Sequence, residues 1–311
     1  VTVAAASLTG LPVTQNHFDL PVDALGILRT DHPHYYRGKL EGETEIQFVD
    51  RIVGNLENLI IAEDPSTIAA FIAEPITGAS GVIVPPDGYY EGIQNVLDKY
   101  GIMFWADEVI TGFGRTGSDF GCTTMEIKSP DMMTFAKQLS SAYMPISASA
   151  IRRDVYEAMI DQSASAGAFG HGYTYSGHPV ACAVALRVLE IYDRDEIFDR
   201  ASTTGKYLQE QLSQFSSHPL VGEVRGSGLL AALELVPNKE LNHQFKDGKV
   251  GGVAQKMAQD NGLLIRTVAG SSIGICPPLI ITNNQIDELI DKLGDALDKT
   301  FQYCQTYKLL T

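Results

Sequence analysis

Three short apolar runs, each closed by a titratable side chain, place the strongest constraint on how this chain folds. The runs are residues 68–76, 102–109 and 131–136. Glu74 and Asp107 are 33 residues apart, and Asp107 and Lys137 are 30 apart. About 30 residues make up one strand–helix–strand unit with a right-handed crossover. The spacing therefore predicts that the three runs are parallel strands of one sheet.

The polar residues at the ends of these strands indicate a binding site. In open α/β sheets, ligands bind beyond the carboxyl ends of the strands. A single polar residue at a strand end is well explained by contact with water. Glu74, Asp107 and Lys137 carry both signs of charge at three successive strand ends, and this combination favours a site.

The rest of the chain predicts a second structural unit. A strand is expected near residues 144–151, followed by a loop rich in Gly and Ser over 163–172. A long helical pattern starts at Pro179, and beyond it come short strands and a closing helix over 284–307. We therefore predict an α/β protein in two parts. Residues 1–183 form a large domain with a mostly parallel sheet, and residues 184–311 form a linking helix and a smaller C-terminal α+β domain.

Charge and cysteine usage exclude several classes of protein. The chain has 38 acidic against 23 basic residues, which gives a net charge of −15. Such a surface repels phosphate backbones and anionic lipids, so we expect neither nucleic acid nor membrane partners. The cysteines are widely spaced and form no CxxC pair, which is typical of free thiols in a reducing compartment. We expect a cytoplasmic protein without a zinc site.

Two local patterns resemble binding motifs but lack the context that those motifs need. Gly112, Gly114 and Gly117 match G-x-G-x-x-G after a strand. A dinucleotide site also needs a helix starting at the third glycine and an acidic residue about 20 positions later. Here a poor helix start follows, and a lysine stands at position 137. The pair His32 and His34 flanks a proline, and we interpret it as a polar turn and not as a metal site.

Asp107 and Lys137 suit a cofactor that has both a basic ring nitrogen and an aldehyde, and pyridoxal phosphate has both. A carboxylate keeps the ring nitrogen protonated, and a lysine amine forms a Schiff base with the aldehyde. Val109 is placed to pack against the ring. The segment 173–177 offers N–H groups and hydroxyls for a phosphate. A buried ion pair would require the same two residues, Asp107 and Lys137. These residues alone therefore do not distinguish a cofactor site from a structural ion pair.

Four segments in order resemble the class III pyridoxal-phosphate aminotransferases, and the ω-amino acid:pyruvate and amine:pyruvate transaminases resemble this chain most. They are AEPITGASGVIVPPDGYY (73–90), FWADEVITGFGRTG (104–117), FAKQLSSAYMPISA (135–148) and HGYTYSGHPVACAVAL (171–186). The resemblance runs along the whole chain. It implies the fold of type I pyridoxal-phosphate enzymes, with an aspartate aminotransferase-like large domain and a smaller C-terminal domain.

The resemblance also implies roles for individual residues. Lys137 would form the internal aldimine and shuttle the proton, Asp107 would hold the ring nitrogen, and Val109 would support the ring. Tyr173 and Thr174 would bind the phosphate of the cofactor in the neighbouring subunit. The implied assembly is a homodimer or a higher homo-oligomer with shared active sites.

The implied reaction is transamination by a ping-pong mechanism, from an amine or ω-amino acid to a keto acid such as pyruvate. Arg266 matches the mobile arginine that pairs with a substrate carboxylate in the amine:pyruvate group. Glu74 matches a motif glutamate that supports the cofactor site. Ala79 stands where enzymes acting on ornithine or 4-aminobutyrate usually carry a glutamate, which argues for the amine or ω-amino acid branch.

The start of the sequence departs from the family pattern. Family members carry a substantial segment upstream, including an aromatic residue that stacks on the cofactor, and this chain begins at Val1 after that point. We therefore expect the N-terminal part of the large domain to be absent. Two alternatives stay open: a catalytically impaired, truncated paralogue, and another class III activity such as an aminomutase or a decarboxylase.

Overall fold

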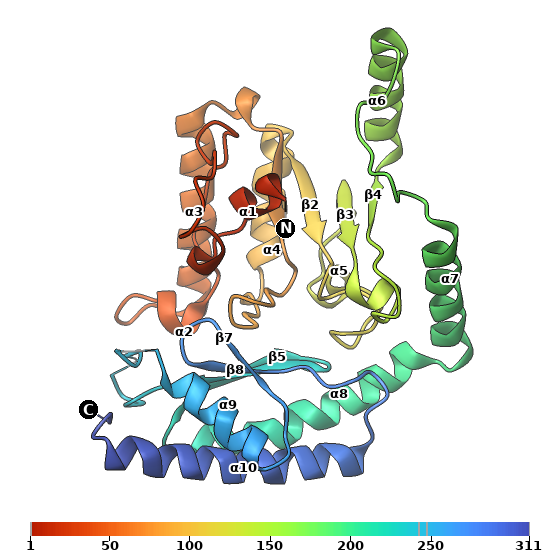
Figure 1. Ribbon diagram of the computed structural model, residues 1–311. Coiled ribbons are helices and arrows are strands. Elements are labelled where there is room, and N and C mark those ends of the chain that lie inside the picture. The colour runs from red at the N-terminus through yellow and green to blue at the C-terminus, as the bar shows by residue number, and fades with distance from the viewer. Residues whose placement is uncertain (1, 242, 247, 311) are drawn as a thin grey trace.

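The computed structural model describes residues 2–241, 243–246 and 248–310, so Val1 lies outside the described residues. Two four-stranded sheets organise this part of the chain. The first sheet has the order β1-β2-β3-β4, and the second has the order β5-β6-β8-β7. In Figure 1 the arrow of β2 points from the first sheet toward the second, so the carboxyl end of β2 faces the other layer.

The first sheet contains the three predicted parallel strands, in shorter form. Its strands are β1 (Ala70–Ala73), β2 (Met103–Asp107), β3 (Met132–Phe135) and β4 (Ala148–Ile151). β1 pairs parallel with β2, and β2 pairs parallel with β3. β4 runs antiparallel to β3 at the edge. The expected α/β architecture with a mostly parallel sheet is thus confirmed.

Two amphipathic helices cover one face of the first sheet. They are α3 (Glu45–Glu63) and α4 (Tyr89–Tyr100), and their buried faces share one hydrophobic cluster with β2. Thr44 and Gln47 form a capping box that starts α3. Gly101 ends α4 in a left-handed conformation with φ of 66°. α4 was predicted from its periodicity, whereas α3 lies outside the predicted elements although its capping signal is present in the sequence.

Alternation along β2 separates the two faces of the sheet. Phe104 and Ala106 are buried against the helices. Trp105 and Asp107 therefore point to the opposite face, because successive side chains of a strand point to opposite sides. On that face the Ile72 side chain is 38% exposed. Asp107 thus stands on the more open side of the sheet.

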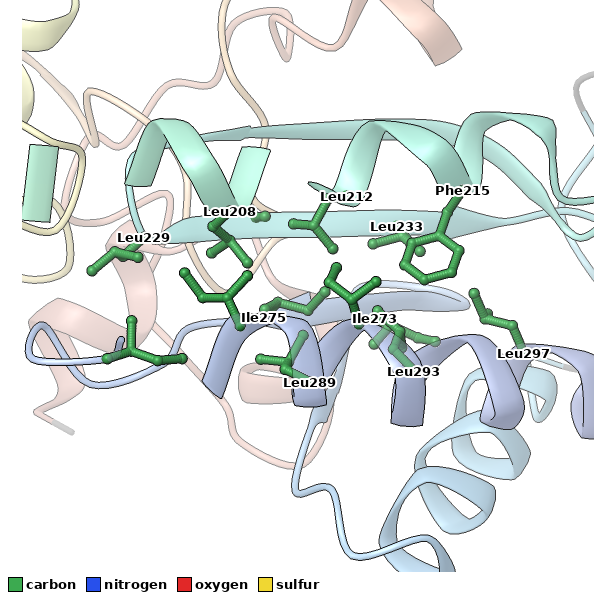
Figure 2. Packing of buried hydrophobic residues seen from close by; sticks show 14 of the residues in the cluster. Leu208, Leu212, Phe215, Leu229, Leu233, Ile273, Ile275, Leu289, Leu293 and Leu297 are labelled. Atoms are coloured by element: carbon green, nitrogen blue, oxygen red, sulfur yellow. The ribbon is translucent and has the colours of Figure 1, made fainter. Parts of the chain in front are cut away.

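The second sheet is antiparallel and packs on two long helices. Its strands are β5 (Val221–Ser227), β6 (Leu230–Leu235), β7 (Arg266–Val268) and β8 (Ser272–Ile275). α8 (Ile197–Ser213) and α10 (Asn283–Thr306) supply the other half of this core. Figure 2 shows leucine and isoleucine side chains from these helices and strands pointing toward one another. Burial of this apolar surface is the main force that holds the C-terminal part together.

The remaining elements connect or flank the two sheets. They include α1 (Val3–Leu8), α2 (Tyr35–Gly38), α5 (Gly121–Thr124), α6 (Arg153–Ala166), α7 (Pro179–Arg194) and α9 (Val250–Asp260). α6 projects away from the rest of the described chain in Figure 1, and none of its described residues is buried. The loop expected from residue 163 is therefore wrong in its first residues, since the helix runs to Ala166. The domain boundary between residues 183 and 184 falls inside α7 and stays a prediction.

β6 is buried on both faces because it lies between two layers. Leu233 and Leu235 belong to the core formed with α8 and α10. Leu230 and Ala232 belong to a separate cluster with Ile76 and Val82 from the segment that follows β1. The first and second sheets are therefore joined by apolar contact next to the predicted site. Within the described ranges, no helix is both long and apolar enough to cross a bilayer.

Glu108 is fully buried and holds the segment between β2 and α5. Its carboxylate oxygens accept hydrogen bonds from the Thr111 hydroxyl at 2.5 Å, the Gly121 N–H at 2.9 Å and the Cys122 N–H at 2.7 Å. The strand alternation turns Glu108 away from the face that carries Asp107. The two adjacent acidic residues therefore have different tasks, and Glu108 has a structural one.

Replacing Glu108 with glutamine tests this task. The amide can keep some of the hydrogen bonds, but its NH2 group faces backbone N–H donors and leaves at least one of them unsatisfied. We expect Glu108→Gln to lower the free energy of unfolding by about 1–3 kcal/mol, measured by urea denaturation. The exposed Glu63 gives the control, and Glu63→Gln should change the value by no more than about 0.5 kcal/mol. Equal stabilities of the two variants would contradict the assignment.

Candidate active site

Asp107 is fixed at the end of β2 by its neighbours on the sheet. It pairs in register with Thr134 of β3. Its Oδ1 atom accepts hydrogen bonds from the Val109 N–H at 3.0 Å and from the Thr134 hydroxyl at 3.3 Å. Both bonds hold the carboxylate in one orientation. Val109 therefore lies directly beside the acid, and its packing against a cofactor ring stays a prediction.

Lys137 follows β3 by two residues and reaches the same edge of the sheet. Its backbone has φ of 42°, a left-handed conformation that is uncommon for a residue with a side chain. The turn after it is closed by hydrogen bonds from the Ser140 and Ala142 N–H groups to the Lys137 carbonyl, at 3.3 and 3.2 Å. The side chain is exposed. Strained backbone of this kind is often found at functional sites, where the surrounding structure maintains it.

Glu74 completes a cluster of three titratable groups. Its Oε1 atom accepts a hydrogen bond from the Gly78 N–H at 3.1 Å, and its carbonyl accepts one from the Tyr90 hydroxyl at 2.6 Å. Burial, and to a smaller extent the charge of Asp107, raise the pKa of the Glu74 carboxyl to about 7, although the Gly78 hydrogen bond and the charge of Lys137 lower it. The structure thus brings Glu74, Asp107 and Lys137 together.

Two buried arginines attach the second sheet to this edge. Arg115 Nη1 donates to the carbonyl groups of Leu229 at 3.0 Å and Pro277 at 2.6 Å. Arg225 donates from Nε and Nη2 to the Gly81 carbonyl, at 2.9 and 2.7 Å. One arginine reaches from the first sheet to the second, and the other reaches back. Their bonds fix the layer that faces the carboxyl ends of the strands.

Arg266 lies in the second sheet, at the start of β7, and it is exposed. Its strand forms a hairpin with β8, and Arg266 pairs in register with Gly274. Ala269 lies in the turn of this hairpin, and Gly81 lies in the segment that follows Glu74. A Cβ atom placed on Gly81 would be 3.8 Å from the Cβ of Ala269, so the hairpin contacts that segment. The structure therefore places Arg266 on a neighbouring element of the strand-end cluster.

Tyr173 and Thr174 lie apart from that cluster. They belong to the exposed connection between α6 and α7, on the outer side of β4 in Figure 1. The Tyr173 N–H donates to the Ser176 hydroxyl at 3.0 Å, which closes a turn within this connection. A role for these two residues in the site of the same chain is not supported by their position.

Two residues that support the site are absent from the residues singled out in the sequence. Thr134 bonds to Asp107, and Tyr90 bonds to the carbonyl of Glu74. Thr134 leaves a signal in the sequence, since it is the single hydroxyl in an otherwise apolar strand. Tyr90 does not, because its partner is a backbone atom 16 residues away.

The two motif-like patterns have structural roles. Gly117, the third glycine of the G-x-G-x-x-G match, does not begin a helix, and a methyl group added there would lie 3.5 Å from the backbone of Gly228. This distance is an ordinary van der Waals contact, and the glycine is favoured instead by its φ of 90°, which side chains rarely adopt.

His34, from the second of these patterns, belongs to a group of three potential metal ligands. This group forms part of an ion-pair network. Ligand atoms of His34, Glu223 and Glu234 lie within 4.8 Å of one another. Glu234 pairs with Arg37 and with Arg225, each at 2.8 Å, and Glu223 pairs with Arg225 at 2.7 Å. The two guanidinium groups already balance the two carboxylates, so the cluster does not need a metal ion for charge compensation.

Comparison with known proteins gives one consistent family. Residues 13–297 match the family model described as aminotransferase class-III. A probable gamma-aminobutyrate transaminase 3, mitochondrial, from Oryza sativa subsp. indica is 49% identical over 300 residues, which cover 96% of this chain and 58% of that protein. Gamma aminobutyrate transaminase 1, mitochondrial, from Solanum lycopersicum has the same identity and coverage. The chain thus spans 58% of the length of these curated relatives.

Solved structures agree with the sequence match. The omega transaminase from Pseudomonas jessenii in complex with PMP superposes with a TM-score of 0.94 at 48% sequence identity. The match covers 97% of this chain and 66% of that chain. The fold expected from the four motifs is therefore confirmed, and the chain belongs to the class III aminotransferase family.

Proposed function

We propose that this chain carries the catalytic centre of a pyridoxal-phosphate-dependent transaminase that moves an amino group from an amine or ω-amino acid to a keto acid. The observation that carries the proposal is the position of Asp107 and Lys137. One ends β2 and the other follows β3, at the carboxyl edge of two paired parallel strands. Ligands bind at this edge in open α/β sheets.

The residues at this edge fit the cofactor that class III aminotransferases use. When bound, pyridoxal 5′-phosphate supplies an aldehyde and an electron-withdrawing pyridine ring. Asp107, held by two hydrogen bonds, would accept a hydrogen bond from the protonated ring nitrogen. Val109 would pack against the ring.

Lys137 has two tasks in this proposal. Its exposed Nζ atom would bond covalently to the carbonyl carbon of the cofactor and, once displaced by a substrate amine, would move a proton at the substrate carbon. Positioned acid–base catalysis of this kind accelerates reactions by about 10²–10⁴-fold. One lysine would serve donor and acceptor in turn, so we propose ping-pong kinetics.

The exposed connection between α6 and α7 supports a proposed assembly of at least two copies. Thr174 carries a hydroxyl that suits a phosphate, and Tyr173 and Thr174 lie in a turn away from the cluster of their own chain. We propose that they bind the cofactor phosphate in the partner subunit of a homodimer, so that each site uses both chains.

The nature of the donor depends on two residues that point to different substrates. Arg266 supports binding of a substrate carboxylate, because guanidinium groups bind carboxylates through two parallel hydrogen bonds. Ala79 disfavours 4-aminobutyrate, whereas the curated relatives are named gamma-aminobutyrate transaminases. We therefore include 4-aminobutyrate beside β-alanine and uncharged amines as donors to be compared with pyruvate as acceptor. Formation of alanine distinguishes a transaminase from an aminomutase or a decarboxylase.

Lys137→Ala tests the covalent link. We expect the wild-type chain to develop a visible absorption band with pyridoxal phosphate that borohydride reduces, because an amine at this position bonds to the aldehyde. The variant should lose both the band and alanine formation. Lys128 is exposed in the same domain and provides the matched control, Lys128→Ala, which should keep both. A variant at residue 137 that retains the reducible band would refute the assignment.

Arg266→Ala tests recognition of the carboxylate. Loss of a charge-assisted interaction of about 1.5–3 kcal/mol should raise the KM for pyruvate by about 10- to 100-fold. The rate of the half-reaction with an uncharged amine should stay within about twofold, because that donor offers no carboxylate to the arginine. Arg187 is exposed on α7, and Arg187→Ala is the control. An equal loss with both substrates would assign Arg266 a structural role.

A further inference from the structure

Glu74 and Asp107 stand at the ends of two neighbouring parallel strands, and Glu74 has no assigned task in proton chemistry. Ala73 pairs in register with Ala106, so the next residues along the two parallel strands, Glu74 and Asp107, stand at the same level. Neighbouring strands in a sheet are about 4.8 Å apart. Phe71 and Ala73 pack against the helix-covered face, which leaves Glu74 for the side that carries Asp107.

The surroundings of the two acids differ. The carboxylate of Asp107 accepts two hydrogen bonds, one from the Val109 N–H and one from the Thr134 hydroxyl. The carboxyl of Glu74 accepts one, from the Gly78 N–H. Hydrogen bonds to a carboxylate favour its ionised form, and burial without them favours the neutral form. When two such groups interact, the proton goes to the site that stabilises the charge less.

The charged and titratable groups around Glu74 come from each element packed against it. Asp107 on β2 contributes a negative charge and Lys137 after β3 contributes a positive one, and both affect the Glu74 carboxyl. Tyr90 on α4 donates to the Glu74 carbonyl, and burial keeps this phenol neutral by raising its pKa well above the usual value. Glu108 is turned to the other side, where three hydrogen-bond donors satisfy it.

We propose that Glu74 and Asp107 form a coupled carboxyl pair in the cofactor-free site, and that Glu74 holds the proton of this pair. Glu74 is then a positioning residue that acts through Asp107. By taking the proton it avoids a second negative charge beside Asp107 and keeps that carboxylate available for a cationic ring nitrogen. The nature of the ligand in this inference rests on the proposed function. The coupling of the two carboxyl groups does not depend on that function.

The pair also changes when a cation arrives. Besides burial, the charge of Asp107 raises the pKa of Glu74, and a cationic ring nitrogen held by Asp107 would offset that contribution. Glu74 would then release its proton to solvent, and the site would gain one negative charge against the positive charge of the ring. Two carboxylates instead of one would then favour the protonated ring nitrogen, with no redox change and no further reactant.

The titration of Glu74 in the cofactor-free chain tests the pair directly. Carbon-13 NMR of the chain with labelled glutamate carboxyls follows each acid, and Glu74→Gln identifies the signal by its loss. We expect the pKa of Glu74 near the value of about 7 that burial and Asp107 produce. Asp107→Asn removes a like charge and should lower this midpoint by about one pH unit, the coupling that marks an interacting pair. Lys137→Met removes an opposite charge and should raise it.

Asp161 lies exposed on α6, and Asp161→Asn is the control, with no expected change in the midpoint. Opposite shifts in the two site variants support the proposal. An unchanged midpoint in either Asp107→Asn or Lys137→Met overturns it, as does a Glu74 signal that titrates like an ordinary glutamate. Circular dichroism of each variant verifies the fold, and the two variants provide independent measurements.

Addition of pyridoxal phosphate at pH 6 to the wild-type chain tests the second half of the proposal. We expect the Glu74 signal to move to its ionised position as the visible band appears. A band without that movement overturns the response of the pair and leaves the proposed function standing. Absence of the band refutes the proposed function, and the titration of the cofactor-free chain still decides whether the pair exists.

Discussion

Parallel pairing of β2 with β3 is the constraint on which the candidate site depends. The register sets Asp107 opposite Thr134, whose hydroxyl fixes the carboxylate, and the same pairing brings Lys137 to the adjacent strand end. A shift by one residue would turn Asp107 toward α4, because side chains alternate along a strand. The buried Phe104 and Ala106 prevent such a shift, since they would then lose their place in the helix-covered core. Packing on one face of the sheet therefore specifies chemistry on the other.

The second sheet completes this arrangement from the opposite side. Leu230 and Ala232 pack on the segment that follows Glu74, and two buried arginines close the joint with hydrogen bonds to carbonyl groups. These interactions hold the second sheet, which includes the hairpin that carries Arg266, against the segment that follows β1. Arg266 and the pair Asp107 and Lys137 thus belong to different layers that one interface fixes in relative position.

Much of this arrangement can be predicted from the sequence, because it depends on local periodicity and on spacing along the chain. The three strands, the helix at Tyr89–Tyr100 and the helix at Pro179–Arg194 all follow from such patterns. The different tasks of Asp107 and Glu108 do not, since they depend on which face of the sheet is covered. The contact of Arg225 with Gly81 links residues 144 positions apart and leaves no local pattern in the sequence.

The hydrogen bonds that hold the two layers together are accepted by main-chain carbonyl groups. Arg115 bonds to the carbonyl groups of Leu229 and Pro277, and Arg225 bonds to that of Gly81. A carbonyl group is present whatever side chain a residue carries. Neighbouring positions such as Ala79 are therefore free to mutate without weakening the contact between the two layers. Side chains around the strand ends can change while the scaffold keeps its geometry, as expected when function resides in sites grafted onto a common fold.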